Sequence, residues 1–414
     1  MKLTKIDDAR NIIFDNISES LKEEYVPIER STGRVLDEDI ISPLDMPSFN
    51  RSKMDGWAIR SEDTPGKFKI TGYLQAGALK ESFTGTEDYS IDDNIHEFET
   101  YKIMTGAPVI KGADAVLQIE KCTVTGDCVV ISEAVKKDDN IARKGEDIQM
   151  GQNVLSKGTV LNGHHISLIA SAGYAQIRVK KKLKVSIIVT GNELEEPSYS
   201  SQNSSPYSKL ETGRIYNSNA WTFLAMCEEN NLDAYYVGTA GDTLQEFNSK
   251  IEDCSDSDII IISGGVSVGD YDLVREGLIR YRAKELFYKV ASKPGKPLLV
   301  CQKDSTLIFG FPGNPVSCMV SFREFLMPAV RKLYGQKNFL PIMIPAIFSG
   351  TYSKEGDRDH FISIELRRDG DLLIASEIKS NSSGDTVSFA NSQALLRVKV
   401  EKINNGDVVE VELI

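Results

Sequence analysis

The stretch Asp258-Ile-Ile-Ile-Ile-Ser-Gly-Gly-Val-Ser-Val-Gly-Asp-Tyr-Asp272 joins an apolar run to a glycine-rich loop. A short β-branched run between polar residues predicts a buried strand of a parallel sheet. The loop at the carboxyl end of such a strand is where open α/β sheets bind ligands. Because Gly264, Gly265 and Gly269 lack a Cβ atom, the loop can turn sharply and approach a bulky anion.

The same loop also carries carboxylates. Asp270 and Asp272 follow the glycines directly. Carboxylates beside a bound phosphate would repel it unless a divalent cation lies between them. The loop therefore predicts a site for phosphate together with Mg²⁺.

The segments around this strand alternate between strand and helix patterns. Such alternation predicts an α/β domain with a parallel sheet and right-handed crossovers. The expected strands are residues 185–189, 234–237 and 258–262, and the expected helices are residues 220–230 and 244–251.

Composition limits the classes of function. Acidic residues outnumber basic ones by 60 to 48, for a net charge of −12, which argues against nucleic acid as the main partner. The sequence contains neither an apolar run long enough to cross a bilayer nor a signal sequence at Met1, so we expect a cytoplasmic protein without membrane contact. Its six cysteines and four histidines lack the spacing of zinc ligands.

A chain of this length should form several domains. Apolar residues at helical spacing predict an amphipathic helix from Thr4 to about Glu24, with Thr4 as its cap. We expect this helix (residues 1–25) to join residues 141–180 in one discontinuous domain. Residues 26–140 are expected to form a β-rich domain, residues 181–335 the α/β domain with a long loop at 197–210, and residues 336–414 a small β domain.

Further signals should meet at the same edge of the α/β sheet. Glu193 follows the strand at 185–189, and Asp242 follows the strand at 234–237, so both join Asp272 as candidate metal ligands. Lys293 and Lys296, in a proline-rigid turn, supply local positive charge. The turn that contains Pro312, Asn314 and Pro315 ends at a helix and can also hold an anion.

Each of these signals also has a structural explanation. An acidic residue after a strand is often a helix cap or a solvated loop charge, and the lysine turn could lie on the surface. The motifs at residues 50–58 and 102–108, read alone, are typical of β-turns. The convergence of the signals favours a phosphate or nucleotide-like ligand.

Six motifs in this order resemble the molybdopterin molybdotransferase family, which includes the gephyrin E domain. The resemblance spans nearly the whole chain. The motifs are Ser52-Lys-Met-Asp-Gly-Trp-Ala58, Met104-Thr-Gly-Ala-Pro108, Thr190-Gly-Asn-Glu-Leu194, Ser263 to Asp272, Lys293-Pro-Gly-Lys-Pro297 and Phe311-Pro-Gly-Asn-Pro-Val316. Departures from the usual pattern are Trp57, Asn192 and the turn Ser382-Ser383-Gly384.

The resemblance implies a homodimer of elongated subunits, each with a linker domain, a β-rich domain, a molybdopterin-binding α/β domain and a C-terminal β-barrel. It implies Mg²⁺-dependent insertion of molybdate into adenylylated molybdopterin, with release of AMP. The active site would lie between subunits, so that Asp55 and Thr105 face the partner's α/β domain. The residues that would act there are Asp55, Thr105, Glu193, Asp242 and Asp272, with Ser267 in the phosphate loop and Arg358 and Ser383 at an anion.

Two other functions compete with this one. The related stand-alone α/β domains are molybdopterin adenylyltransferases, although those usually lack the flanking β modules. A gephyrin-like chain could also be a non-catalytic scaffold. Candidate partners besides a second copy are the adenylyltransferase that makes the substrate and the molybdoenzyme apoproteins that receive the product.

Overall fold

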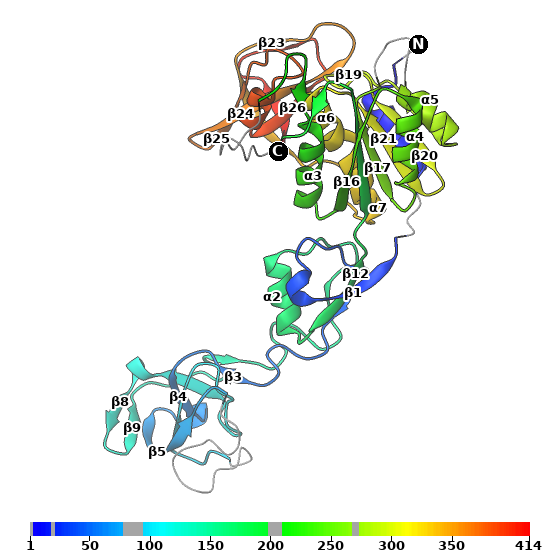
Figure 1. The fold of residues 1–414 in the computed structure, drawn as a ribbon. Coiled ribbons are helices and arrows are strands. Elements are labelled where there is room, and N and C mark those ends of the chain that lie inside the picture. The colour runs from blue at the N-terminus through cyan, green and yellow to red at the C-terminus, as the bar shows by residue number, and fades with distance from the viewer. Residues whose placement is uncertain (1–2, 18–20, 78–93, 198–208, 267–272) are drawn as a thin grey trace.

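The computed structural model describes residues 3–17, 21–77, 94–197, 209–266 and 273–414. The chain is elongated, with the α/β domain and the C-terminal β domain at one end, a small linker domain in the middle and the β-rich domain at the other end (Figure 1). Most of the predicted loop at 197–210 lies outside the described residues.

The α/β domain contains a six-stranded sheet in the order β16-β13-β17-β21-β20-β18. The first four strands pair in parallel, as predicted for the core, and the last two pair antiparallel. The strands are β16 (Asp233–Ala240), β13 (Lys184–Thr190), β17 (Ile259–Ser263), β21 (Thr306–Phe311), β20 (Leu299–Lys303) and β18 (Lys284–Tyr288).

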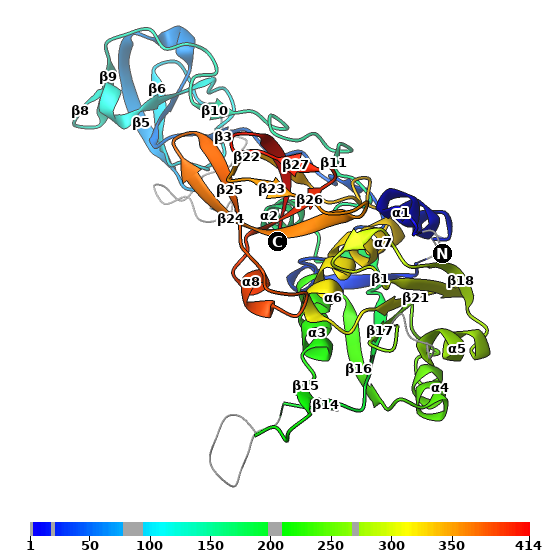
Figure 2. The ribbon, with the colours of Figure 1, turned by 90° about the horizontal axis from the view of Figure 1, so that it is seen from above.

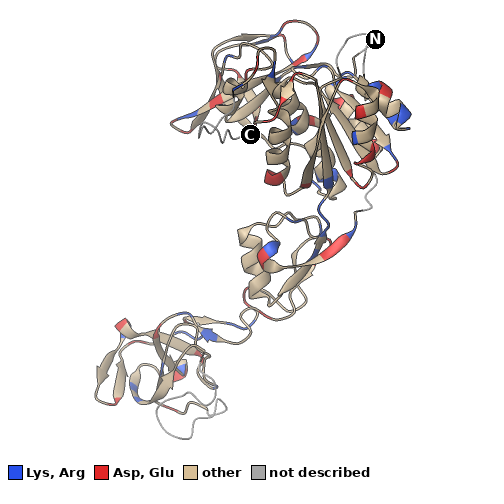
Figure 3. Cartoon of the chain, in the orientation of Figure 1, with Lys and Arg blue, Asp and Glu red and all other residues tan. Residues whose placement is uncertain are grey.

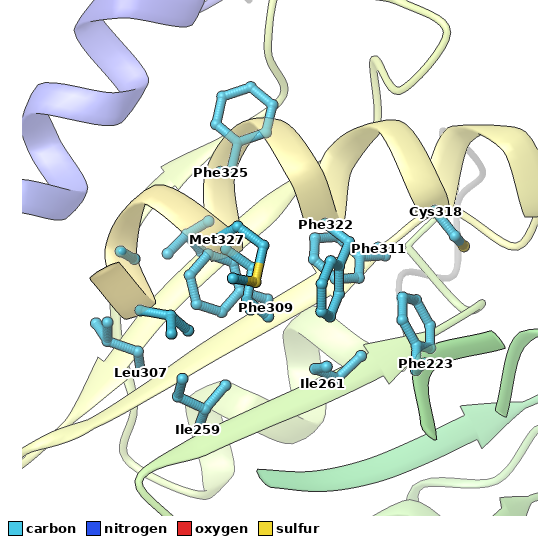
Figure 4. Close-up of a cluster of buried hydrophobic side chains, with 14 of the residues drawn as sticks. Phe223, Ile259, Ile261, Leu307, Phe309, Phe311, Cys318, Phe322, Phe325 and Met327 are labelled. Carbon is cyan, nitrogen blue, oxygen red and sulfur yellow. The ribbon is translucent and has the colours of Figure 1, made fainter. Parts of the chain in front are cut away.

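Helices cover both faces of this sheet, which explains the unbroken isoleucine run of β17. Ile259 and Ile261 belong to the larger buried cluster, whereas Ile260 and Ile262 belong to the cluster on the opposite face. The aromatic rings of Phe309 and Phe311 in β21 and of Phe322 in the helical segment that follows lie in the larger cluster (Figure 4). That face carries α3 (Asn219–Glu229), α6 (Pro315–Ser321), the π-helical turn η4 (Phe322–Leu326) and α7 (Met327–Leu333), and the other carries α4 (Leu244–Glu252) and α5 (Leu273–Arg280).

The N-terminal helix differs from its prediction in length, cap and partner. Helix α1 spans Ile6–Asp15, begins after Lys5 and has no side-chain cap, while Thr4 instead forms a parallel bridge with Val290. Its apolar side packs into the larger cluster of the α/β domain and contacts α7 and β18. The apolar side of this helix therefore packs against the α/β domain, whereas the sequence predicted that it joins residues 141–180.

Two separated segments do form the linker domain, but their bounds differ from those predicted. Its core joins Val26, Leu36 and Ile40 to Leu161, Ile169, Ile177 and Val179, so residues from 26 to at least 40 belong here and not to the β-rich domain. Its elements are β1 (Glu23–Pro27), η1 (Ile28–Arg30), β2 (Ile40–Ile41), β11 (Asn153–Leu155), α2 (Gly163–Ser171) and β12 (Gln176–Lys180). Asn162 caps α2 by accepting bonds from the backbone N–H groups of His164 and His165.

The β-rich domain is a six-stranded sheet in the order β7-β4-β6-β5-β9-β8. Its elements are β3 (Arg51–Ser52), β4 (Gly56–Ile59), η2 (Ser61–Asp63), β5 (Gly66–Leu74), β6 (Glu99–Ile103), β7 (Ala115–Gln118), η3 (Ile119–Lys121), β8 (Thr123–Thr125), β9 (Cys128–Ile131) and β10 (Ile141–Ala142). Separate buried clusters occupy the two faces of this sheet.

The C-terminal domain is a closed five-stranded barrel, which confirms the expected architecture. Strand pairings run from β24 through β25, β22, β28 and β26 back to β24. Its elements are β22 (Met343–Ser349), β23 (Tyr352–Ser353), β24 (Asp359–Asp369), β25 (Leu372–Glu377), α8 (Thr386–Ala390), β26 (Ala394–Val398), β27 (Lys402–Ile403) and β28 (Val408–Leu413). Strand β19 (Ser292–Lys293), which leaves the α/β domain, pairs with β24 and joins the two domains.

Charged residues of both signs are distributed over all parts of the chain (Figure 3). Among the described residues, we find no helix long and apolar enough to cross a membrane.

Candidate active site

A pocket of about 510 Å³ lies at the carboxyl edge of the parallel strands of the α/β sheet. Residues at or just after the ends of β13, β16, β17 and β21 line it, which is where this class of sheet binds ligands. The predicted site residues that the pocket brings together are Glu193, Asp242, Gly264, Gly265, Pro312 and Asn314.

The first two glycines of the β17 loop are required by their surroundings. Gly264 has a φ of +91°, and a Cβ atom there would lie 2.6 Å from the carbonyl oxygen of Thr190. A Cβ atom on Gly265 would lie 2.9 Å from the Thr190 hydroxyl. The glycines therefore let the loop turn tightly against Thr190 at the end of β13, while the predicted approach of the loop to an anion stays a prediction. The other predicted members of the loop, Ser267, Gly269 and Asp272, lie outside the described residues.

Asn192, directly before Glu193, is hydrogen-bonded to Asp242. Its backbone N–H donates to Oδ2 of Asp242 at 3.4 Å, and its side-chain oxygen accepts from the backbone N–H of Asp242 at 3.3 Å. Asn192 therefore holds the turn before Glu193 against the turn that carries Asp242. Within the described ranges, no three acidic, histidine or cysteine side chains gather as metal ligands do; the predicted third ligand is Asp272, beyond those ranges.

The predicted cations line a second pocket, also of about 510 Å³, between the α/β domain and the barrel. The two pockets share Pro297, Pro312 and Asn314 in their walls. The acidic and basic residues that were expected to meet at one edge of the sheet therefore line two adjoining pockets. The second contains Lys293, Lys296, Arg358 and Ser383.

Pairing between the domains places these residues together. Lys293 lies opposite His360 in the β19–β24 pairing, so the barrel brings Arg358 to the same region. Arg358 donates from Nη1 to the carbonyl of Ser292 at 3.2 Å. Asn314, which makes no side-chain cap at the start of α6, instead donates from Nδ2 to the hydroxyl of Ser383 at 2.7 Å. Pro315 is the first residue of α6 and lines neither pocket.

The sequence did not point to two titratable residues of the second pocket, His360 and Glu377. His360 is 2% exposed, its Nδ1 lies 2.8 Å from the hydroxyl of Tyr352 and its Nε2 lies 3.1 Å from the carbonyl of Glu355. Because a carbonyl only accepts, Nε2 carries the hydrogen and Nδ1 accepts from Tyr352. Burial, aided by Lys293, lowers the pKa of His360, and burial raises the pKa of Glu377. Only the long-range strand pairing of the barrel brings them here.

Asp55 and Thr105 form a separate pair in the β-rich domain. The backbone N–H and the hydroxyl of Thr105 both donate to Oδ1 of Asp55, at 2.7 and 2.8 Å. These bonds, the backbone one foremost, lower the pKa of Asp55 and keep it ionised. The pair precedes β4 and follows β6, at the opposite end of the chain from both pockets (Figure 1).

Comparison with known proteins agrees with this architecture. Residues 4–173 match the family model described as the MoeA N-terminal region (domain I and II), and residues 186–332 match the one described as a probable molybdopterin binding domain. A relative from Staphylococcus aureus strain Mu50, named molybdopterin molybdenumtransferase, is 31% identical over 408 residues, which cover 96% of this chain and 93% of the relative. A Staphylococcus epidermidis RP62A relative of the same name is 32% identical over 403 residues, covering 95% and 91%.

Solved structures show the same similarity over the full length. A crystal structure of the molybdopterin biosynthesis moeA protein from Pyrococcus horikoshii OT3 is 28% identical, with a TM-score of 0.82 and complete coverage of both chains. A molybdenum cofactor biosynthesis protein from Pyrococcus furiosus, 20% identical with a TM-score of 0.61 and complete coverage of both chains, shares the fold.

Proposed function

The chain belongs to the molybdopterin molybdenumtransferase (MoeA) family, and on that premise we propose that it inserts molybdate into adenylylated molybdopterin and releases AMP. The observation that carries this proposal is the pair of adjoining pockets. One offers carboxylates and a glycine turn, and the other offers lysine and arginine side chains. A substrate with a pyrophosphate group and a separate oxyanion needs both kinds of surface.

Glu193 and Asp242 are suited to hold Mg²⁺ in the first pocket. Carboxylate oxygens are the ligands that this hard cation prefers, and it usually keeps several waters. Two protein carboxylates are therefore sufficient, and Asp272 would add a third. Bound there, Mg²⁺ would neutralise charge on the pyrophosphate. The protein holds the two carboxylates in the first pocket, apart from the lysine and arginine side chains of the second pocket. The two pockets share one wall.

Molybdate would bind in the second pocket. Lys293, Lys296 and Arg358 lie around it, and the hydroxyl of Ser383 offers a further polar contact. A doubly charged oxyanion gains from several fixed cations, especially in a chain with an acidic net charge. The shared wall at Pro312 and Asn314 would place the oxyanion next to the substrate in the first pocket.

The direct test is AMP release. Purified protein is incubated anaerobically with adenylylated molybdopterin and Mg²⁺, with and without molybdate, and AMP is measured by chromatography. We expect release that depends on molybdate. AMP release at the same rate with and without molybdate would contradict the proposal. Adenylylation of molybdopterin by this protein with ATP alone would also contradict it and would favour the adenylyltransferase alternative.

We further propose a homodimer whose active site uses Asp55 and Thr105 of one subunit and the two pockets of the other. The physical reason is the distance along the elongated chain between that pair and the pockets (Figure 1). Asp55→Ala and Glu193→Gln proteins should each lose nearly all AMP release as homodimers. A hybrid dimer formed by co-expression would have one intact site of its two. When the subunits pair at random, half of the dimers are hybrids, so the mixture should recover about a quarter of wild-type AMP release. No recovery, in hybrids verified by differential tags, would contradict a shared site.

A further inference from the structure

A two-stranded ribbon carries Glu193 at the mouth of the first pocket. Strand β14 (Leu194–Glu195) pairs in parallel with β15 (Ile215–Tyr216). The backbone N–H of Ile215 donates to the carbonyl of Glu193 at 2.9 Å, and that of Asn217 donates to the carbonyl of Glu195 at 2.8 Å. The ribbon projects from the body of the domain beside α3 and β16 (Figure 2). So short a ribbon needs a further contact to have a fixed position.

Glu196, directly after β14, provides that contact. Its Oε1 accepts from the hydroxyl of Tyr236 at 2.7 Å and from Nδ2 of Asn217 at 2.8 Å, and its Oε2 accepts from Nε1 of Trp221 at 3.2 Å. Asn217 is only 1% exposed, and it also donates to the hydroxyl of Tyr236 at 2.9 Å. One carboxylate thus ties together the ribbon, α3 and the edge strand β16.

An irregularity in β16 creates this arrangement. The register between β13 and β16 shifts at Val237, which has no partner in the pairing. In a regular strand, residues 236 and 239 would point to opposite faces, and one extra residue brings them to the same face. The hydroxyls of Tyr236 and Thr239 accordingly lie 2.7 Å apart. Bulges of this kind commonly re-aim side chains near functional sites.

The same strand carries Asp242 two residues beyond its end. The ribbon and β16 are therefore joined at two places, once by Asn192 with Asp242 and once by Glu196 with Tyr236. We propose that Glu196 is a positioning residue that sets the separation of Glu193 and Asp242, the two carboxylates of the first pocket. This inference rests on the proposed function, in which those carboxylates act together on one substrate.

The neighbouring residue Glu195 offers a matched control. Its nearest ionic partner is Arg214, at 3.7 Å, and both side chains are substantially exposed. Glu195→Gln removes the same charge from the same ribbon without touching the contacts of Glu196. Glu196→Gln keeps the size of the side chain but replaces one acceptor oxygen by an NH₂ donor. This NH₂ group must face either the indole N–H of Trp221 or the donors of Tyr236 and Asn217, so at least one hydrogen bond is lost.

The experiment measures AMP release as a function of Mg²⁺ concentration for wild type, Glu195→Gln and Glu196→Gln. We expect Glu196→Gln to lower the rate by roughly 10- to 100-fold, as expected for a small misplacement of a reacting group, and to raise the Mg²⁺ concentration needed for half the maximal rate. Glu195→Gln should resemble wild type in both respects. Melting temperatures identify any variant that has lost its fold.

A double variant separates positioning from general support of the fold. If Glu196 acts through Glu193, the substitution Glu196→Gln should cost less than about threefold in a Glu193→Gln background, because groups that act as a unit are not additive. Full additivity, or an unchanged Mg²⁺ dependence in Glu196→Gln, would overturn the inference while leaving the proposed function standing. Absent AMP release in wild type would instead reject the function. Acrylamide quenching of Trp221, which is 51% exposed whereas Trp57 is buried, checks independently that the contact has been broken.

Discussion

Glu193→Gln should slow molybdate-dependent AMP release by roughly 10²- to 10³-fold, the usual cost of removing one preorganised charged contact from an active site. The side chain is exposed and lines the first pocket, so its loss should leave the fold intact. Its carboxylate lies over the backbone of Gly191, where an added Cβ atom would approach Oε2 to 2.6 Å. The glycine is therefore part of what lets the carboxylate occupy this position.

That close approach supplies a second variant for the same prediction. Gly191→Ala keeps every ionisable group but pushes the carboxylate of Glu193 away and strains a backbone at φ +143°. We expect it to lower AMP release as well, with a smaller effect than Glu193→Gln. Rates of both variants are compared by single-turnover AMP release, alongside melting temperatures. A Glu193→Gln protein with wild-type turnover would remove Glu193 from the mechanism.

The parts of the site that are local in sequence could be predicted without a structure. The β17 loop, the turn before Glu193 and the turn before Asp242 each follow a strand, and the carboxyl ends of parallel strands share one edge of a sheet. This rule placed Glu193, Asp242, Gly264 and Gly265 in one pocket. It needed only the order of strands and helices.

What depends on contacts between distant segments was harder to predict. His360 enters the second pocket through the pairing of β19 with β24, and no local pattern specifies that register. The hydrogen bonds of Glu196 with Tyr236 and Asn217 depend on a bulge in β16, which no local sequence pattern predicts. The apolar side of α1 was evident from its spacing, but periodicity alone does not identify the surface against which a helix packs.

A buried ionic cluster lies where α1 meets the C-terminal barrel. Glu324, in the π-helical turn η4, is 4% exposed. Arg10 of α1 donates from Nη2 to its carboxylate and from Nε to its backbone carbonyl, the latter at 2.9 Å. Next to it, Arg323 donates to Oε1 of Glu412 of β28 at 2.8 Å. The cluster therefore connects the first helix, the α/β domain and the last strand of the chain.

Removing Arg10 should destabilise the protein strongly. At pH 9, above the raised pKa of Glu324, Arg10→Ala leaves an ionised carboxylate buried without its cation, a change that typically costs about 3–5 kcal/mol. Arg10→Met combined with Glu324→Gln removes both charges and keeps the volume, so it should recover most of the loss. Urea unfolding followed by circular dichroism measures the free energies. A loss below about 1 kcal/mol, as at a surface ion pair, would show that the carboxyl does not depend on Arg10.

The same cluster predicts how stability changes with pH. Burial, opposed by Arg10 and reinforced by Glu412, raises the pKa of Glu324 from its ordinary value of 4.5 to about 8. Between those values the folded protein binds a proton that the unfolded chain has released, so this group's contribution to stability falls as pH rises towards 8. Glu324→Gln removes the titration, and its urea midpoint should therefore fall less than that of wild type between pH 6 and pH 9. The urea midpoint of Arg10→Ala should instead fall more than that of wild type between pH 6 and pH 9, because the carboxyl of Glu324 is then forced to ionise without a partner.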